Sequence, residues 1–238
     1  MPTNTVEKPQ EIYQIKVTLL GTDPPIWRRL LIPADLTLEQ LHDVLQAAMG
    51  WEDCHMHEFR IGKQRFGKPD PMEQAFGGPR TASERTARLF TVLGKARAKA
   101  VYTYDFGDSW DHEIVVEKCL APEPGRAYPA CLAGERHGPP EDCGGLPGFY
   151  NLLEATGDPE HEQHEELIEW LGDDFDPEAF SADEVKQRLA PLQRRRKKPP
   201  PARTEALFSE KSAPQAFLRR LAENSQSTRE HTPGNSQA

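Results

Sequence analysis

The stretch Tyr102-Thr-Tyr-Asp-Phe-Gly-Asp-Ser-Trp-Asp-His-Glu-Ile-Val-Val116 predicts two β-strands joined by a turn. In its first half, aromatic residues alternate with Thr103 and Asp105, which is the period-two pattern of a half-buried strand. Gly107-Asp108-Ser109 supplies the turn, because glycine tolerates a positive φ and Asp and Ser side chains bond nearby backbone groups. Trp110 then opens the apolar face of the second strand. We therefore expect a β-hairpin in which Trp110 is buried.

The segment before this hairpin predicts another hairpin followed by a helix. Residues 11–20 and 26–32 alternate as strands on either side of a turn that contains Gly and Pro. Thr37 is a good helix N-cap, and Gln40 three residues later completes a capping box. Apolar residues follow at helical spacing as far as Gly50, which predicts the helix end. This order of elements is similar to the opening of a β-grasp fold.

The rest of the domain predicts one more strand and several helices. Residues 54–61 favour a strand with His55 and His57 on one face, whereas 121–140, with five prolines, favours a loop. Helices are expected over 147–155, 158–171 and 181–189. Together these elements predict an α+β fold with a mostly antiparallel or mixed sheet and helices packed on one face.

Composition divides the chain into a domain and a tail. The domain is expected over about 10–192, and residues 193–238 form a basic tail rich in Pro and Ser, a composition typical of disorder. The net charge is −9, yet residues 194–238 carry ten Lys or Arg against four Asp or Glu. The acidic domain therefore repels a phosphate backbone, and any nucleic-acid partner is expected to contact the tail. The candidate contacts are Arg194, Arg195, Arg196, Lys197 and Lys198.

The sequence also bears on the compartment of the protein. Its N-terminal residues lack the apolar segment of a secretory signal, and no apolar run is long enough to span a membrane. Four cysteines are too few for a disulfide scaffold in a chain of 238 residues, so reduced thiols are expected. These observations predict a cytoplasmic protein.

Several motifs in series resemble one family. They are Pro25-Ile-Trp-Arg-Arg29, Thr37-Leu-Glu-Gln-Leu-His42, Gly50-Trp51, His55-Met-His-Glu-Phe59, Tyr104-Asp-Phe-Gly-Asp-Ser-Trp-Asp-His-Glu-Ile114, Pro139-Pro-Glu-Asp-Cys-Gly-Gly145 and Phe175-Asp-Pro-Glu-Ala-Phe180. Over about residues 11–190 the chain is similar to the plasmid pRi ORF-three-like family. The resemblance implies a compact α+β domain, frequent linkage to plasmids and transposons, and no agreed biochemical activity. Family members often have Cys immediately before Pro139, where this chain has Gly138.

Asp105, Asp108 and His112 form the candidate acid–base set. Near Trp110, burial raises the pKa of a carboxyl group, and a neighbouring imidazole then acts as a base. The structural alternative is that Asp108 closes the turn by bonding backbone N–H groups while His112 meets a carboxylate across the sheet.

Two sets of residues are candidate metal ligands, with zinc as the candidate ion. His55 and His57, two residues apart on one strand face, have a spacing compatible with a single ion. Cys131, His137 and Cys143 lie with Glu141 and Asp142 in one proline-rich segment, where an ion would hold a loop that buries little apolar surface. In both sets the alternative is structural packing and hydrogen bonding without metal.

A shared polar cluster connects these sets to function. We expect His57 and His112 to face the same core and to approach each other or a shared carboxylate, with Asp105 or Asp108 as the candidates, because a buried imidazole needs a hydrogen-bond partner. The leading hypothesis is a binding or accessory protein, with an unidentified protein or nucleic-acid partner, that holds a structural metal. The alternatives are a metal-dependent hydrolase or nuclease built on the His/Asp cluster, and a nucleic-acid-binding protein that acts through its basic tail.

Overall fold

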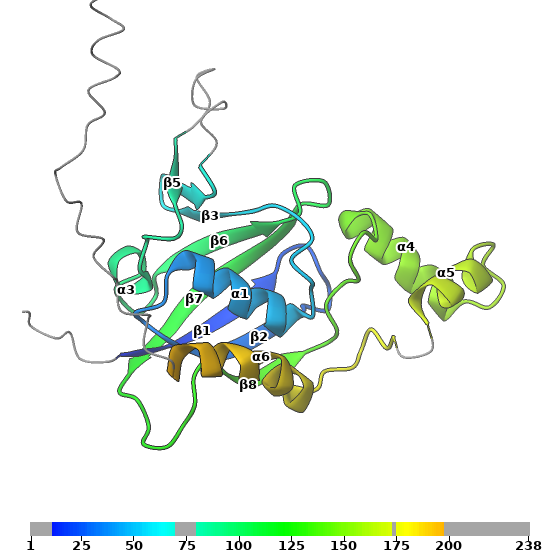
Figure 1. Cartoon of the computed structure of the whole chain (residues 1–238). Coiled ribbons are helices and arrows are strands. Elements are labelled where there is room, and N and C mark those ends of the chain that lie inside the picture. The colour runs from blue at the N-terminus through cyan, green and yellow to red at the C-terminus, as the bar shows by residue number, and fades with distance from the viewer. Residues whose placement is uncertain (1–10, 70–79, 173–174, 198–238) are drawn as a thin grey trace, which may run out of the picture. The chain divides into compact units, whose positions relative to one another are not determined.

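The computed structural model describes residues 11–69, 80–172 and 175–197. In this part of the chain the strands form one eight-stranded sheet (Figure 1). In spatial order they are β5 (Thr81–Ser83), β4 (Gln64–Gly67), β3 (His57–Ile61), β6 (Lys99–Tyr104), β7 (Trp110–Leu120), β1 (Ile12–Leu19), β2 (Trp27–Pro33) and β8 (Ala130–Glu135). The helices are α1 (Leu38–Met49), α3 (Leu89–Val92), α4 (Gly145–Gly157), α5 (His164–Leu171) and α6 (Ala182–Lys197). Only β4 and β5 pair in parallel, so the predicted α+β class with a mostly antiparallel sheet is confirmed.

The sheet has an apolar face and a polar face, because its strands alternate. In β1, Ile15 and Val17 are buried in the core, while Lys16 between them points to the other face. On that polar face Arg29 donates two hydrogen bonds, of 2.8 and 2.9 Å, to the Glu117 carboxylate. One face therefore packs against helices and the other meets solvent, as is common for antiparallel sheets.

Helix α1 lies across the apolar face, with α6 beside it (Figure 1). Its predicted capping box is confirmed: Gln40 N donates to Thr37 Oγ1, and Thr37 N donates to Gln40 Oε1. Gly50 ends the helix in the left-handed region at φ 93°, also as predicted. The buried Arg28 side chain caps the C-terminal end of α1, because its Nε donates a hydrogen bond of 3.0 Å to the Ala48 carbonyl.

The central hairpin is β6 followed by β7. Trp110 is 1 % exposed, which confirms its predicted burial. The turn differs in detail from the prediction, because Asp105 rather than Asp108 organises it. The Asp105 side chain accepts from Gly107 N at 2.9 Å, and its carbonyl accepts from Ser109 N. Asp105 and Ser109 both adopt positive φ, at 53° and 56°.

Four predicted elements differ from the structure. The strand expected over 54–61 begins only at His57. The segment 121–140 is not all loop, since β8 pairs with β2 inside it and α6 covers it. Helix α5 begins at His164 rather than at Asp158, because the Asp158 carboxylate bonds Glu160 N in a turn instead of capping a helix. Helix α6 does not end near 189 but continues to Lys197, past the predicted domain end at 192.

The predicted basic tail lies almost entirely outside the described residues. Arg194 belongs to the last turns of α6, and Lys198 falls beyond the described part of the chain. Among the described helices, none has the length and apolar character needed to cross a lipid bilayer.

Candidate metal centre

Three segments far apart in sequence meet at one end of the β6–β7 hairpin. They are residues 51–56 between α1 and β3, the turn at 105–109, and the loop 141–145 that leads into α4. Glu52 N donates to the Glu141 carboxylate at 3.0 Å, which holds the third segment against the first. Just before the third segment, the Pro139 carbonyl accepts from Trp51 Nε1 at 2.9 Å. The third segment also contacts the turn, because Gly144 N donates to the Asp108 carboxylate at 3.1 Å.

His55 lies at the centre of this junction. Its Nε2 atom lies 3.1 Å from Asp142 Oδ1, 3.7 Å from Asp105 Oδ2 and 3.9 Å from Glu141 Oε2. The His55 Nε2 atom is nevertheless buried without a hydrogen-bond partner among the described residues, and so is Glu141 Oε2. We name His55, Asp105, Glu141 and Asp142 the His55 cluster.

Two of the three carboxylates are oriented by hydrogen bonds to their other oxygen. Asp105 Oδ1 accepts from Gly107 N, which leaves Oδ2 toward His55. Glu141 Oε1 accepts from the Tyr104 hydroxyl at 2.9 Å and from Glu52 N at 3.0 Å, which leaves Oε2 toward His55. Outer groups of this kind fix the direction of metal ligands. The Asp142 side chain is 73 % exposed, so the cluster is open to solvent on that side.

Backbone geometry explains why loop 141–145 contains two consecutive glycines. Gly144 and Gly145 both adopt left-handed φ, at 87° and 66°. A Cβ atom at Gly145 would lie 2.7 Å from the Asp108 carbonyl oxygen. A Cβ at Gly138 would lie 2.5 Å from the Met49 carbonyl oxygen, so this backbone leaves no room for the cysteine that family members often carry there.

A second histidine pair lies deeper in the core. The rings of His42, from α1, and His57, from β3, stack with centroids 3.5 Å apart and planes 7° apart. His42 Nδ1 lies 2.8 Å from the Tyr102 hydroxyl, and His42 Nε2 lies 2.8 Å from Asp53 Oδ1. His57 Nε2 lies 2.8 Å from the buried Glu84 carboxylate. His42, Asp53 and His57 also have ligand atoms close enough for one ion, but the bonds already made satisfy both nitrogens of His42.

His112 is buried on the same sheet face as His57, as predicted. The register places Tyr102 opposite His112, and Tyr104 opposite both His57 and Trp110. The expectation of a shared Asp105 or Asp108 is wrong, because His57 bonds Glu84, and His112 Nδ1 bonds the carbonyls of Trp110 at 3.0 Å and Tyr102 at 3.3 Å. For His112 Nδ1, backbone carbonyls are the hydrogen-bond acceptors, where we expected a carboxylate.

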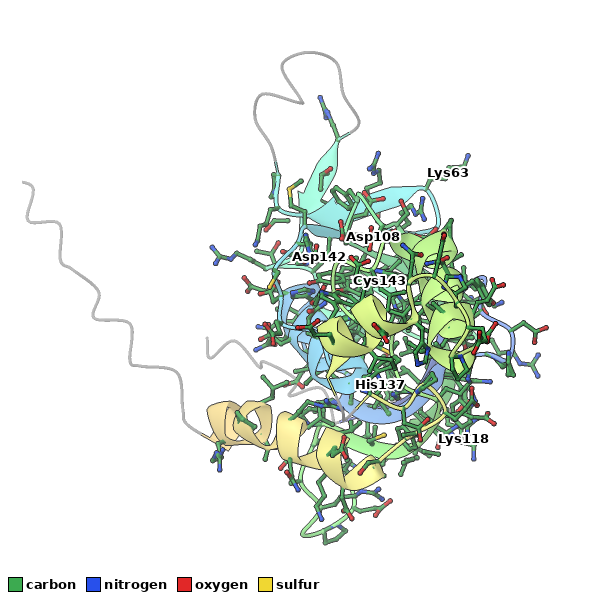
Figure 2. The ribbon with its side chains drawn as sticks, turned by 90° about the vertical axis from the view of Figure 1, so that its right-hand side faces the viewer. Lys63, Asp108, Lys118, His137, Asp142 and Cys143 are labelled. Carbon is green, nitrogen blue, oxygen red and sulfur yellow. The ribbon has the colours of Figure 1, made fainter. Side chains whose placement is uncertain are left out.

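The other candidate ligands are not brought together. His55 and His57 face different clusters, since His55 precedes the strand rather than alternating within it. Cys131 lies in β8 and bonds the Ala133 carbonyl, whereas Figure 2 shows His137 well apart from Cys143. In the part of the chain that the structure describes, these three residues form no group with metal-ligand spacing.

Two features of this region escaped the sequence analysis. His42 interrupts the apolar side of α1 beside Leu38, Leu41 and Leu45, and that position is a signal of a buried polar partner. Glu84 had no such signal, because it follows the short strand β5 and reaches His57 only through the folded structure.

The comparisons with known proteins agree with this architecture. The sequence model of the plasmid pRiA4b ORF-3-like protein family matches residues 11–184. The chain belongs to this family. Uncharacterized protein y4hQ of Sinorhizobium fredii is 39% identical over 183 residues, which cover 76% of this chain and 92% of that protein. The crystal structure of MM3350, a protein of unknown function from Methanosarcina mazei Go1, has a TM-score of 0.66 and 39% identity, and covers 75% of this chain and 98% of that one.

Membership confirms the predicted family, and the names of these relatives specify no activity. Function therefore has to be argued from the site. Three of the motifs that carried the resemblance supply the His55 cluster: His55-Met-His-Glu-Phe59, the motif that contains Asp105, and the motif that contains Glu141 and Asp142.

Proposed function

We propose that this protein binds one divalent transition-metal ion through His55, Asp105 and Asp142, with Glu141 as a further ligand. The observation that carries the proposal is the buried His55 Nε2 atom, which faces three carboxylate oxygens without a hydrogen-bond partner among the described residues. Three carboxylates gathered around one imidazole repel one another, and a bound cation removes that repulsion.

The spacing of the ligand atoms supports the same proposal. Bonds of about 2.0–2.1 Å in a tetrahedral site place neighbouring ligand atoms about 3.3 Å apart. The His55 Nε2 atom lies 3.1 Å from Asp142 Oδ1 and 3.7 Å from Asp105 Oδ2, and the ligand atoms of these three residues all lie within 4.8 Å of one another. Glu141 Oε2 lies 3.9 Å from His55 Nε2 and outside this group. One imidazole with several carboxylates favours zinc, manganese or iron over calcium, which prefers ligand sets made only of oxygen.

The positions of the other candidate catalytic residues favour metal binding over metal-dependent hydrolysis as the function. The hydrolase hypothesis also required Asp108 and His112 at the reacting centre. Asp108 instead accepts from Gly144 N, and His112 bonds backbone carbonyls. The proposal is therefore a metal-binding accessory protein whose ion joins three loops.

The test is titration of the chelator-treated protein with Zn²⁺ and Mn²⁺ by calorimetry. The wild type is expected to take up one equivalent of at least one of these ions. Asp142→Asn, an isosteric change at an exposed side chain, is expected to weaken binding at least tenfold, and His55→Ala to abolish it.

His161→Ala is the matched control, because His161 lies outside both candidate metal groups of the described residues. It is expected to bind like the wild type. Retention of full affinity in both His55→Ala and Asp142→Asn would reject the His55 cluster and assign the ion elsewhere, with the His42–His57 pair as the next candidate.

A further inference from the structure

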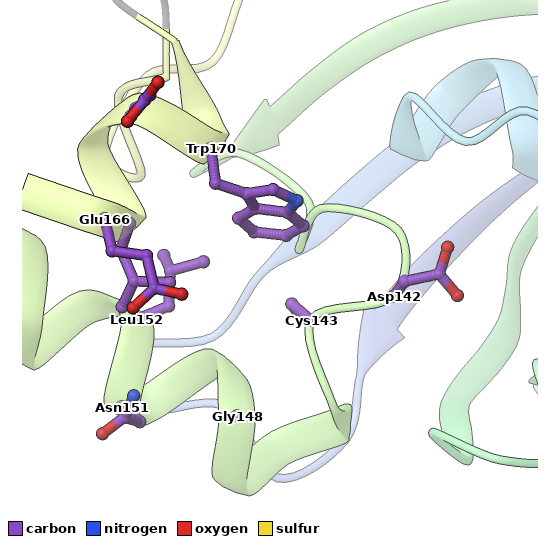
Figure 3. Close-up of a pocket in the computed structure, with 9 residues that line it drawn as sticks. Asp142, Cys143, Gly148, Asn151, Leu152, Glu166 and Trp170 are labelled. Atoms are coloured by element: carbon purple, nitrogen blue, oxygen red, sulfur yellow. The ribbon is translucent and has the colours of Figure 1, made fainter. Parts of the chain in front are cut away.

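A cavity of about 470 Å³ opens on the other side of loop 141–145 (Figure 3). It lies between α4, α5 and the residues Asp142 and Cys143. Its volume falls in the range of ligand pockets, about 300–1,000 Å³. In Figure 3 the Asp142 side chain points away from the cavity, on the opposite side of the loop from Cys143. The cavity and the His55 cluster therefore lie on opposite sides of the same loop, with Asp142 belonging to both.

Its walls combine an aromatic surface with apolar side chains. Trp170 is 50 % exposed although it is a large aromatic residue, and its indole extends over the cavity toward Cys143 (Figure 3). Leu152 contributes apolar surface from α4. Burial raises the pKa of the Cys143 thiol to about 12, so that group is an uncharged part of the wall at neutral pH. An exposed indole of this kind offers a π face to a ligand.

The charge of the cavity is negative. Its lining includes Glu166 and Glu169 besides Asp142, and no Lys, Arg or His. Neither Glu166 nor Glu169 is paired with a basic side chain of the described residues. The acidic groups also do not converge: no three of the lining side chains offer ligand atoms within 4.8 Å of one another in the described chain. Separated carboxylates suit an extended cation better than a single metal ion.

We propose that this pocket binds a small organic ammonium ion, an aliphatic diamine or polyamine. An ammonium group is attracted to the face of an indole and to carboxylates, and the methylene chain between ammonium groups contacts apolar walls. Trp170 supplies the first of these contacts, Glu166 and Glu169 the second, and Leu152 the third. The proposal does not depend on metal binding at the His55 cluster.

The experiment is calorimetric titration of the full chain with spermidine at low ionic strength. Saturable binding is expected, and 1,4-butanediol, which is uncharged and of similar chain length to part of spermidine, is expected not to bind. The double variant Glu166→Gln/Glu169→Gln is expected to raise Kd at least tenfold, because the changes remove charge without changing shape. Trp170→Ala is expected to raise Kd by a similar factor.

Glu165→Gln is the matched control, since Glu165 is exposed on the same helix and does not line the cavity. It is expected to change Kd less than twofold. Absence of saturable binding would overturn the proposal. An equal loss in Glu165→Gln would overturn it too, because the attraction would then come from the acidic surface in general. Binding of a Lys-rich peptide without binding of spermidine would replace a small amine with a protein partner.

Discussion

At the scale of single residues, His112 shows how burial determines the charge of a side chain. Its Nδ1 lies within hydrogen-bond distance of two backbone carbonyls, so Nδ1 carries a proton, whereas the buried Nε2 atom has no hydrogen-bond partner among the described residues. Complete burial lowers the pKa of His112 to about 4, and burial also lowers the pKa of His42 to about 4. Neither group therefore accepts a proton at neutral pH without a cost to the fold.

This predicts a loss of stability in mild acid. Between pH 6.5 and about 4 the unfolded chain protonates these histidines and the folded chain does not, so the free energy of unfolding falls as pH falls. Each histidine contributes at most about 1.4 kcal/mol per pH unit in that window. Urea unfolding at pH 7.5, 6.5 and 5.5 measures the effect.

His112→Phe is expected to show a smaller fall, because it removes one of the two protons taken up on unfolding. His161→Ala is expected to retain the full fall. An unfolding free energy that stays constant from pH 7.5 to 5.5 would contradict the prediction, because the folded and unfolded chains would then take up the same number of protons.

At the scale of elements, the contact of loop 141–145 with the central turn determines the His55 cluster. Asp105 organises the turn through Gly107 N, and Asp108 holds the loop through Gly144 N. This contact holds the loop that carries Glu141 and Asp142 beside His55. The two carboxylates of the turn therefore have different roles. Asp105 faces the proposed metal site, and Asp108 positions the loop that carries the other proposed ligands.

Gly145→Ala is predicted to break this contact. The new Cβ would lie 2.7 Å from the Asp108 carbonyl oxygen, at a left-handed φ of 66°. We expect a loss of about 1–3 kcal/mol in unfolding free energy, measured by denaturant titration, and weaker metal binding. Gly157→Ala, at the other end of α4, is the control: its Cβ would meet nothing within 4 Å, so no comparable loss is expected. Equal stability of the two variants would show that the contact between loop 141–145 and the central turn does not contribute to folding stability.

At the scale of the whole molecule, the described hydrophobic core and the segment with an excess of basic over acidic residues occupy different parts of the chain. The buried apolar residues of the described chain run from Ile12 to Leu189. Ten Lys or Arg lie in residues 194–238. We therefore predict that truncation after Lys197 leaves the melting temperature within about 2 °C, because it removes none of that core.

Truncation after Gln193 tests the nucleic-acid hypothesis, because it removes all the candidate contacts from Arg194 to Lys198. Affinity of the full chain for duplex DNA is expected to fall steeply between 50 and 200 mM salt, and to decrease on truncation, since an acidic domain repels phosphates. In the variant truncated after Lys197, a melting temperature lowered by more than about 5 °C would show that residues beyond 197 contribute to folding stability.

The sequence by itself predicted the features that depend on neighbouring residues. Alternation predicted the β6–β7 hairpin and the burial of Trp110, and the Thr37–Gln40 pair predicted the start of α1. These are local properties, since strand periodicity and helix capping involve residues only a few positions apart. Strand β8 was missed because its residues alternate weakly and its pairing with β2 is a distant contact.

Only the tertiary structure decided which polar groups meet. His55 and Asp105 are 50 positions apart and His55 and Asp142 are 87 apart, and no local pattern relates them. The sequence predicted that His57 needs a hydrogen-bond partner but did not identify Glu84 as that partner. A buried imidazole can form hydrogen bonds with many kinds of donor or acceptor group, so its residue type alone does not specify the partner. The path of the chain between strands determines which one is placed there, and that path is set by the packing of the whole domain.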